Sequence, residues 1–255
     1  MSRRRRTRPP GRTPPRIQFS AWPMTPAVRW MLIVLFALWV ITLIIHASVR
    51  FEPQRFDALV VEPLALDPSR VVQGHVWQLV TYIGVHDVRG LGHIFFNLLA
   101  LFFFAPPLEE RLGTRRMLET FLVGGIAGGL LVLLVDRLMA GAFANHTPTV
   151  VMGASGSVSA VVAAMCWLWR DRTLNLILFR AKGWHLLVGF VVLDLLRALT
   201  GQPIAVLAHL GGTAAGIALA MNLGPYAAWQ RFRLWRVRRR IRTVTGGRDD
   251  RDLLN

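Results

Sequence analysis

The sequence predicts an all-α polytopic membrane protein, folded as a bundle of six transmembrane helices. Of its 255 residues, 53% are hydrophobic, and the mean hydropathy is positive. Several apolar runs reach the length of about 20 residues that a helix needs to cross a bilayer. Arginines gather at the ends of these runs and in the two tails, as they do in the loops of membrane proteins.

The charge of the chain is large, but its placement does not indicate a nucleic-acid partner. The net charge is +16, and the basic residues flank apolar segments or lie in the tails. This is the ordinary pattern of a membrane protein, so no nucleic acid is expected as a partner. The single cysteine, Cys166, lies within an apolar run, and we expect a buried, inert thiol.

Two segments precede the first long connection. Residues 1–26 are rich in arginine and proline, cannot bury a core, and are expected to form a disordered basic cytoplasmic tail. Residues 28–47 form the first span. A cleaved signal peptide would share the basic region and the apolar stretch. This stretch is long for a signal peptide and no convincing small-residue cleavage site follows it, so we expect an uncleaved helix.

A long connection, residues 48–92, separates the first span from the others. It contains an amphipathic aromatic stretch, residues 77–82, that suits a membrane interface. Connections of this length usually have a function or some structure of their own. Five further spans are expected after it, at residues 93–108 or 93–112, 117–138, 150–169, 184–199 and 203–223.

The spans form one membrane domain, residues 27–224, followed by a basic cytoplasmic tail, residues 225–255. Residues 232–242 of this tail are basic and partly amphipathic, and we expect them to lie on anionic lipid of the bilayer. The two tails and the connections after spans two and four together hold 24 of the 30 basic residues. Six spans with both termini in the cytoplasm satisfy the positive-inside bias.

Four polar residues are expected at one depth in this bundle. Spans two, four and six all run from outside to inside, and His93, Asn97, Ser155 and His209 lie near their starts. His93 and Asn97 are four residues apart, so they share one helix face. Polar groups inside a membrane are costly and usually face an interior or a water-filled cavity. Their convergence therefore favours a functional site.

Glycines accompany the two groups that would react. Gly153 and Gly156 surround the serine, and Gly212 and Gly216 follow the histidine. Small residues let helices approach closely, which a Ser–His hydrogen bond across two helices requires. A purely structural interpretation stays open, in which the glycines serve packing, the serine bonds to its own helix and the histidine is a satisfied interior residue.

Four motifs carry a resemblance to a known family. They are His93-Ile94-Phe95-Phe96-Asn97, Glu109-Glu110-Arg111-Leu112-Gly113-Thr114, Gly153-Ala154-Ser155-Gly156, and Ala208-His209-Leu210-Gly211-Gly212 with Gly216. In this order they resemble the motifs of rhomboid intramembrane serine proteases. The resemblance covers residues 28–223 and implies a six-transmembrane-helix rhomboid-like bundle.

The resemblance also implies a mechanism and a substrate. Ser155 would be the nucleophile and His209 the general base, because a serine hydroxyl is a weak nucleophile until a base takes its proton. The Ser155 N–H, His93 and Asn97 would stabilise the oxyanion. The substrate would be a transmembrane helix of another membrane protein, cleaved near the outer interface where that helix unwinds.

No third catalytic group is expected. A triad needs a carboxylate to orient the histidine, and the candidates Asp136 and Asp194 lie at or within other spans with no clear register to His209. We therefore predict a Ser155/His209 dyad, as in the family. No metal or other cofactor is expected, because the chain has no His-Glu-x-x-His motif and its histidines lack a carboxylate at ligand spacing.

Some positions depart from the family or have secondary roles. The Trp-Arg pair of the family's first loop reads Trp77-Gln78 here, so the role of that arginine is open. His86 is given only a structural or water-retaining role. Glu109 and Arg111 are expected to brace a loop rather than to act in catalysis.

Two other functional classes stay open. A non-catalytic rhomboid-fold protein would bind membrane clients, although such relatives typically lack the serine or the histidine. A transporter or channel would be lined by the same polar groups and would carry a flux. Arginine outnumbers lysine 29 to 1, which is typical of GC-rich genomes. Together with the compact core, this favours a bacterial plasma membrane; the oligomeric state is not predicted.

Overall fold

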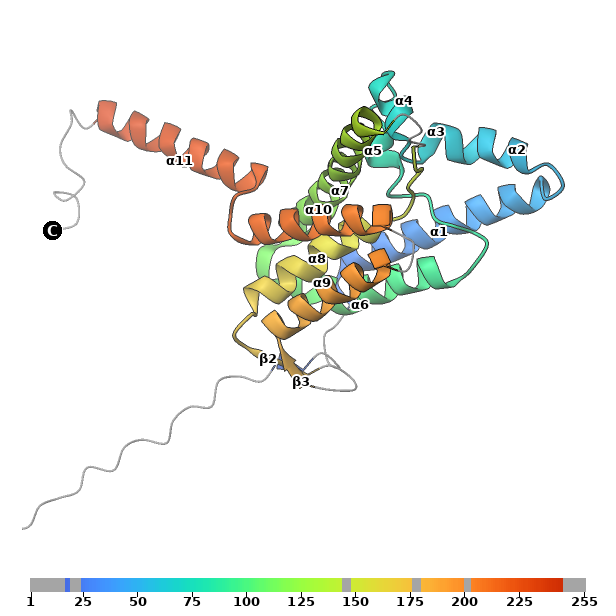
Figure 1. Cartoon of the computed structure of the whole chain (residues 1–255). Coiled ribbons are helices and arrows are strands. Elements are labelled where there is room, and N and C mark those ends of the chain that lie inside the picture. The colour runs from blue at the N-terminus through green and yellow to red at the C-terminus, as the bar shows by residue number, and fades with distance from the viewer. Residues whose placement is uncertain (1–16, 19–23, 144–147, 176–179, 200–202, 245–255) are drawn as a thin grey trace, which may run out of the picture.

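The computed structural model describes residues 17–18, 24–143, 148–175, 180–199 and 203–244 (Figure 1). Apolar helices account for most of them. They are α1 (Pro26–Ser48), α6 (Gly92–Leu112), α7 (Thr114–Ala142), α8 (Ser155–Leu168), α9 (Gly183–Leu199) and α10 (Pro203–Ala220). Each coincides with one of the apolar runs of the sequence. The structure is mostly helical, as predicted, but it is not all-α, because three short strands form a small sheet.

Three of the described helices, α1, α6 and α7, are long and apolar enough to cross a membrane. The apolar parts of α8, α9 and α10 are shorter, covering residues 155–168, 183–196 and 205–220. The fourth predicted span was too long at its start, because residues 150–154 are not helical. Val151 instead exchanges two backbone hydrogen bonds with Leu66, of 2.8 and 2.9 Å. Gly153 has a φ of +122°, which is outside the range of a right-handed helix, so α8 begins only at Ser155.

Helix α8 is the centre of the bundle. Every residue from Gly156 to Cys166 is buried, and α6, α7, α9 and α10 all contact this helix. Its sequence explains the position, since the first half of α8 consists mostly of glycine, serine, alanine and valine. Small side chains let neighbouring helices approach the backbone closely. The buried thiol of Cys166 lies on this helix, as the sequence predicts.

Glycines set the closest helix contacts. A Cβ added to Gly212 on α10 would lie 2.8 Å from the carbonyl carbon of Gly156 on α8. One turn further, a Cβ on Gly216 would lie 2.8 Å from both the Cα and the carbonyl carbon of Ala160. Such distances are not tolerated by real Cβ atoms, so α8 and α10 touch through bare backbone.

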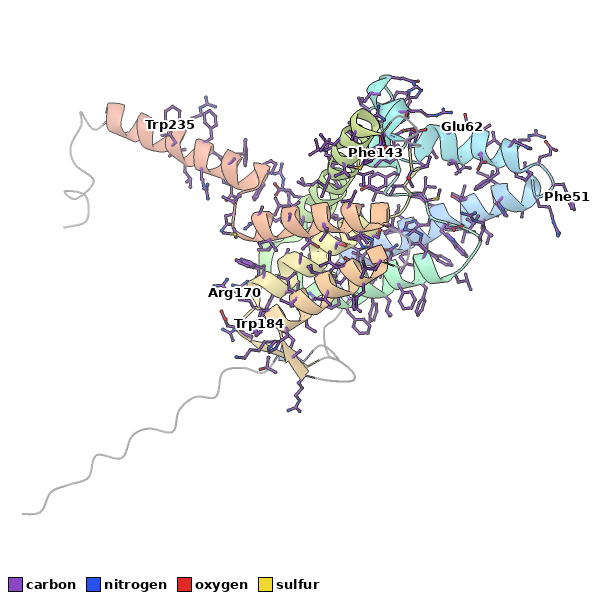
Figure 2. All side chains as sticks on the ribbon, viewed as in Figure 1. Phe51, Glu62, Phe143, Arg170, Trp184 and Trp235 are labelled. Carbon is purple, nitrogen blue, oxygen red and sulfur yellow. The ribbon has the colours of Figure 1, made fainter. Side chains whose placement is uncertain are left out.

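Many large apolar side chains are exposed on the outside of the bundle, and Figure 2 shows the side chains around the ribbon. On α9, the side chains of Val192, Leu193, Leu195 and Leu196 are exposed. An exposed apolar surface of this extent marks a membrane-contacting protein rather than a protein surrounded by water.

The long connection between α1 and α6 has structure of its own. It contains α2 (Pro53–Phe56), the π-helical turn η2 (Asp57–Val61), α3 (Glu62–Leu64), α4 (Pro68–Val72) and α5 (Gln78–Thr81). Gln78, which replaces the family arginine, is fully buried. Its Oε1 accepts from the Asp67 N–H at 3.0 Å, and its Nε2 donates to the Glu62 carbonyl at 2.8 Å. The glutamine thus ties two turns of the connection together.

The two tails are only partly described. In the amino tail, which we expected to be disordered, Ile17–Gln18 form strand β1, parallel to β2 (Thr173–Asn175), which pairs with β3 (Arg180–Lys182). The rest of that prediction lies outside the described residues, apart from residues 24–26. The carboxyl tail forms one helix, α11 (Pro225–Val244), longer than the expected segment 232–242, and it projects away from the bundle (Figure 1).

Candidate active site

Ser155 is the first residue of α8, half-buried, at the end of the bundle where the preceding segment enters. The N–H groups of a helix's first turn have no acceptor inside the helix, and they carry the positive end of its dipole. The N–H of Ser155 is one of these groups. Gly153, two residues earlier, is fixed by a 2.9 Å hydrogen bond from its N–H to the Tyr82 carbonyl. The backbone that leads into Ser155 is therefore fixed in place.

His86 holds the neighbouring residue. Its Nε2 accepts a 3.1 Å hydrogen bond from the Ala154 N–H, so the ring proton belongs on Nδ1, which faces the Gly84 carbonyl at 3.4 Å. Burial, together with the nearby charge of His93, lowers the pKa of His86 to about 4. A neutral ring is needed to accept from a backbone N–H. His86 therefore fixes the backbone immediately before Ser155. This role is more specific than the one expected from the sequence.

His93 reaches the same place from α6. A Cβ added to Gly153 would lie 2.6 Å from Cε1 and 2.7 Å from Nε2 of His93, so this ring covers the glycine directly. The rings of His93 and His86 have centroids 5.3 Å apart. The absence of a side chain at Gly153 gives the imidazole of His93 access to the backbone before Ser155.

Asn97 lies one turn further along α6 and is buried. Its Nδ2 donates to the carbonyl of His93 at 3.0 Å, so one amide proton is used within its own helix. The second amide proton of Asn97 takes no part in that bond. His93 and Asn97 thus lie on one face of α6, as their spacing of four residues predicts.

His209 is on α10, next to the contact between α10 and α8. A Cβ on Gly156 would lie 3.1 Å from the carbonyl oxygen of Ala208, so the neighbours of Ser155 and His209 touch. Among the described residues, the Ser155 hydroxyl and the His209 imidazole make no hydrogen bond to each other. Catalytic hydrogen bonds of free enzymes are often long and tighten when substrate binds.

A carboxylate does reach His209, contrary to the prediction from the sequence. Oδ1 of Asp194 on α9 lies 2.8 Å from Nδ1 of His209, and both side chains are largely buried. Sequence reasoning missed the pair because the register between α9 and α10 cannot be read from either helix alone. The sequence did offer one signal: Asp194 is a single acid within an apolar stretch. Burying an acid in a membrane segment is costly, and such residues usually have a function. The other candidate, Asp136, bonds to Arg137 at 2.6 Å.

Glu109 and Arg111 lie at the opposite end of α6 from His93. Glu109 is buried and accepts hydrogen bonds from Thr25, at the start of α1, and from Thr114, at 2.6 Å, at the start of α7. The guanidinium of Arg111 lies 5.2 Å from the ring centroid of Trp169. These contacts join helix ends away from the serine.

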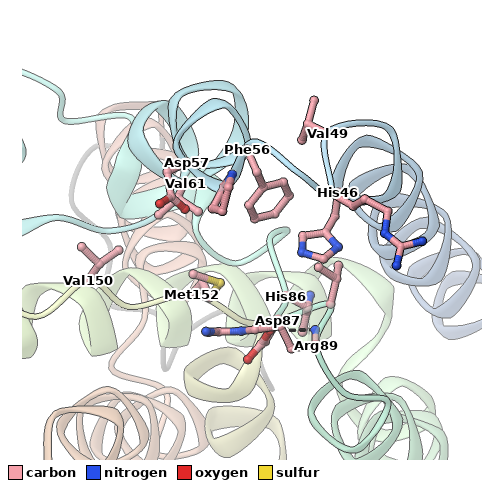
Figure 3. A pocket seen from close by; sticks show the side chains of 13 residues that line it. His46, Val49, Phe56, Asp57, Val61, His86, Asp87, Arg89, Val150 and Met152 are labelled. Carbon is pink, nitrogen blue, oxygen red and sulfur yellow. Dashed lines mark hydrogen bonds and ion pairs between the residues drawn. The ribbon is translucent and has the colours of Figure 1, made fainter.

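A cavity of about 420 Å³ lies beside His86 (Figure 3). It is bounded by the end of α1, by α2 and η2, by the loop before α6 and by the segment that leads to Ser155. Its polar lining includes His46, Asp57, Asp87 and Arg89, and Asp87 accepts from the Arg89 side chain at 3.0 Å. Val150 and Met152 bring the segment before α8 to its wall. Among the described residues, no group of three or more His, Cys, Asp or Glu side chains could hold a metal ion.

Known proteins resemble this chain over its helical core. A sequence model described as "Rhomboid domain" matches residues 73–226. The "RHOMBOID-like protein 12, mitochondrial" of Arabidopsis thaliana is 32% identical over 158 residues, which are 58% of this chain and 44% of that protein. The "Putative rhomboid protease YdcA" of Bacillus subtilis is 27% identical over 152 residues, 59% of this chain and 68% of that protein.

A third relative has similar coverage. The "Rhomboid protease GlpG" of Serratia proteamaculans is 31% identical over 157 residues, 60% of this chain and 50% of that protein. The chain spans about half the length of the first curated relatives that it matches. The shared region includes α6, α8 and α10, which carry the polar residues described above.

Proposed function

The chain belongs to the rhomboid family, and on this premise we propose that it is an intramembrane serine endopeptidase. It cleaves transmembrane helices of other membrane proteins near the outer membrane interface. The observation that carries the proposal is the meeting of three helices around Ser155. His93 of α6 lies over Gly153, and Ala208 of α10 contacts Gly156. A nucleophile, a base and oxyanion donors are thereby available at one helix N-terminus.

Ser155 is the proposed nucleophile and His209 the general base. Nε2 of His209 takes the hydroxyl proton while Oγ of Ser155 attacks the scissile carbonyl carbon, and the carbonyl oxygen becomes an oxyanion. The imidazolium then gives the proton to the leaving amine, the C–N bond breaks, and an acyl-enzyme remains. Water hydrolyses the acyl-enzyme with His209 again acting as base.

The oxyanion is stabilised by donors that are present before the reaction. The N–H of Ser155 lies at the positive end of α8, and the side chains of His93 and Asn97 supply further donors from α6. Removal of one such donor commonly costs about 3–4 kcal/mol of transition-state stabilisation. The Asn97 amide, held by the His93 carbonyl at 3.0 Å, is oriented for this role before substrate arrives.

The substrate and the membrane arrangement follow from the physics of helices in lipid. A transmembrane helix satisfies all its backbone hydrogen bonds internally, so a scissile carbonyl is reached only where that helix unwinds. We propose six spans in residues 27–224, with both tails on the cytoplasmic side of a bacterial plasma membrane. In this arrangement the shorter apolar helices α8, α9 and α10 also span the membrane, and packing against neighbouring helices supports them in place of length.

The carboxyl tail is proposed to contact anionic lipid. Along α11, the exposed side chains include Arg231, Arg233 and Arg236 together with Trp229 and Trp235. Trp235 is labelled on this helix in Figure 2. Basic residues interleaved with tryptophan suit the headgroup region of a bilayer.

Labelling with a fluorophosphonate tests the proposal on the purified full chain in detergent. The wild type should become covalently labelled, and Ser155→Ala should not. Ser159→Ala is the matched control, because Ser159 lies one turn further on the same helix and its hydroxyl bonds to the Ser155 carbonyl at 2.7 Å. Absence of labelling in folded wild type, with retained binding of a membrane client, would favour a non-catalytic client-binding protein instead.

A further inference from the structure

We propose that Asp194 is a positioning residue for His209, so that the site works as a Ser–His–Asp unit rather than as a dyad. The inference rests on the function proposed above. It begins from the 2.8 Å contact between Oδ1 of Asp194 and Nδ1 of His209. This contact joins α9 to α10, two helices that pack against each other.

Asp194 points into the protein, whereas the residues next to it on α9 point outwards. Val192, Leu193, Leu195 and Leu196 are 46–60% exposed, whereas Asp194 is 2% exposed. Asp194 shares its helix face with Leu187 and Phe190, which pack against the core. A turn of helix that presents leucine outwards and buries only its acid is suited to lipid outside and a polar site inside.

The contact determines which nitrogen of His209 reacts. A carboxylate oxygen only accepts hydrogen bonds, so the ring must carry its proton on Nδ1 to donate to Asp194. The lone pair is then on Nε2, which is the nitrogen left to take the proton of Ser155. Asp194 fixes both the tautomer and the rotation of the ring, because α9 and α10 are packed helices.

The contact also affects the charged intermediate state. When Nε2 accepts the serine proton, His209 becomes positively charged next to a buried carboxylate at hydrogen-bond distance. Interactions between opposite charges are strong where water is excluded. Asp194 keeps its charge and takes no proton in this step, so the proton passes from Ser155 to His209 and then to the leaving amine.

A structural role predicts something different. If the pair served only to join α9 and α10, its loss would lower stability and leave the folded fraction fully active. A positioning role predicts that the rate falls while the fold persists. The two roles are separated by measuring turnover, melting temperature and the state of the His209 ring on the same preparations.

The variant to compare with the wild type is Asp194→Asn, which keeps the size of the side chain. Asp136→Asn is the matched control, because Asp136 is a buried acid on α7 whose described partner is Arg137. For folded Asp194→Asn we expect kcat for a transmembrane substrate to fall by roughly 10³–10⁴-fold with little change in KM. The control should keep its kcat within a few-fold of the wild type.

Nuclear magnetic resonance gives a readout that does not depend on activity. With ¹⁵N-labelled histidine, the Nδ1 proton of His209 should show a downfield, hydrogen-bonded resonance, assigned by its loss in His209→Gln. The resonance should be present in the wild type and in Ser155→Ala and should be lost or move upfield in Asp194→Asn. Its absence from the wild type would overturn the inference even if Asp194→Asn did not fold.

The outcomes separate the inference from the proposed function. An active wild type with a fully active, folded Asp194→Asn would overturn the role of Asp194 and leave the protease standing. An inactive, unlabelled wild type that still shows the resonance would overturn the protease itself, and the positioning role with it. Reduced kcat in Asp194→Asn, together with the change in the resonance, would support both.

Discussion

Gly212→Ala should separate α8 and α10, the two helices that carry the proposed nucleophile and base. The added Cβ would lie 2.8 Å from the carbonyl carbon of Gly156 and closer still to its oxygen, whereas ordinary contacts begin at 3.4 Å. The carbon pair alone therefore requires 0.6 Å of separation, and the oxygen requires more. Both obstacles are backbone atoms, so no side chain can rotate away to relieve them.

The expected consequences are a loss of stability and a larger loss of rate. Overpacking of this kind typically costs about 1–3 kcal/mol. Gly212 is less than one turn from His209, and Gly156 follows Ser155, so the displacement falls directly on the proposed nucleophile and base. A misplacement of about 1 Å can lower the rate of an enzyme by roughly 10²-fold. We expect turnover by the folded Gly212→Ala protein to fall by about that factor.

The matched control is Gly189→Ala on α9, where an added Cβ meets nothing within 4 Å. This change should leave turnover unchanged and raise stability slightly, since alanine is favoured over glycine in a helix by up to about 1 kcal/mol. Thermal unfolding in detergent and cleavage of a fluorescent transmembrane substrate are measured on the same preparations. If folded Gly212→Ala cleaved at the wild-type rate, the close contact of α8 and α10 would not be what positions the two groups.

Three further predictions concern the surroundings of the site. His86 has a pKa of about 4 in the folded protein against 6.5 in the unfolded chain, so the unfolded chain binds more protons between these pH values. The free energy of unfolding should therefore fall by about 3 kcal/mol as the pH drops through that window. Denaturant titrations should show a weaker pH dependence in His86→Asn. Gln78→Ala should lower the free energy of unfolding by about 1–3 kcal/mol, because it removes two partly buried hydrogen bonds worth about 0.5–1.5 kcal/mol each. The exposed Gln73→Ala should not lower it, and equal melting temperatures of wild type and Gln78→Ala would contradict this role of the glutamine. Asn97→Ala should lower turnover partially, with substrate binding nearly unchanged; normal turnover with a lower melting temperature would remove Asn97 from the site.

The helices could be predicted from the sequence more completely than their contacts. Apolar length and arginine placement located α1, α6, α7, α9 and α10 to within a few residues, because those signals belong to each segment separately. The start of α8 was misplaced because residues 150–154 are as apolar as the helix that follows them. What stops the helix is the pairing of Val151 with Leu66 and the φ of Gly153, and both depend on the tertiary fold.

The candidate site was predictable where a motif or a spacing within one helix defined it. His93 and Asn97 share a face by simple periodicity, and Ser155 stands out by its small neighbours. The roles of His86 and Asp194 were not predictable in this way. Each acts on a residue of another element, His86 on the Ala154 N–H and Asp194 on the His209 ring, and no periodicity within a helix determines such pairs.

The sequence also could not show how Gln78 would substitute for an arginine. An arginine offers donors only, while glutamine offers both donors and an acceptor. The structure uses both, since Gln78 accepts from one backbone N–H and donates to one carbonyl of the same connection. Gln78 therefore holds this connection through contacts that need an acceptor as well as donors.

The measurement that tests the central claim most directly is proteolysis in a bilayer. The full chain is reconstituted in liposomes with a single-pass substrate whose transmembrane helix has glycine near its outer end, and the products are identified by mass spectrometry. The wild type should cut once, near that outer end, and folded Ser155→Ala should give no product above background. Cleavage by Ser155→Ala at the wild-type rate would contradict the assignment of Ser155 as the nucleophile.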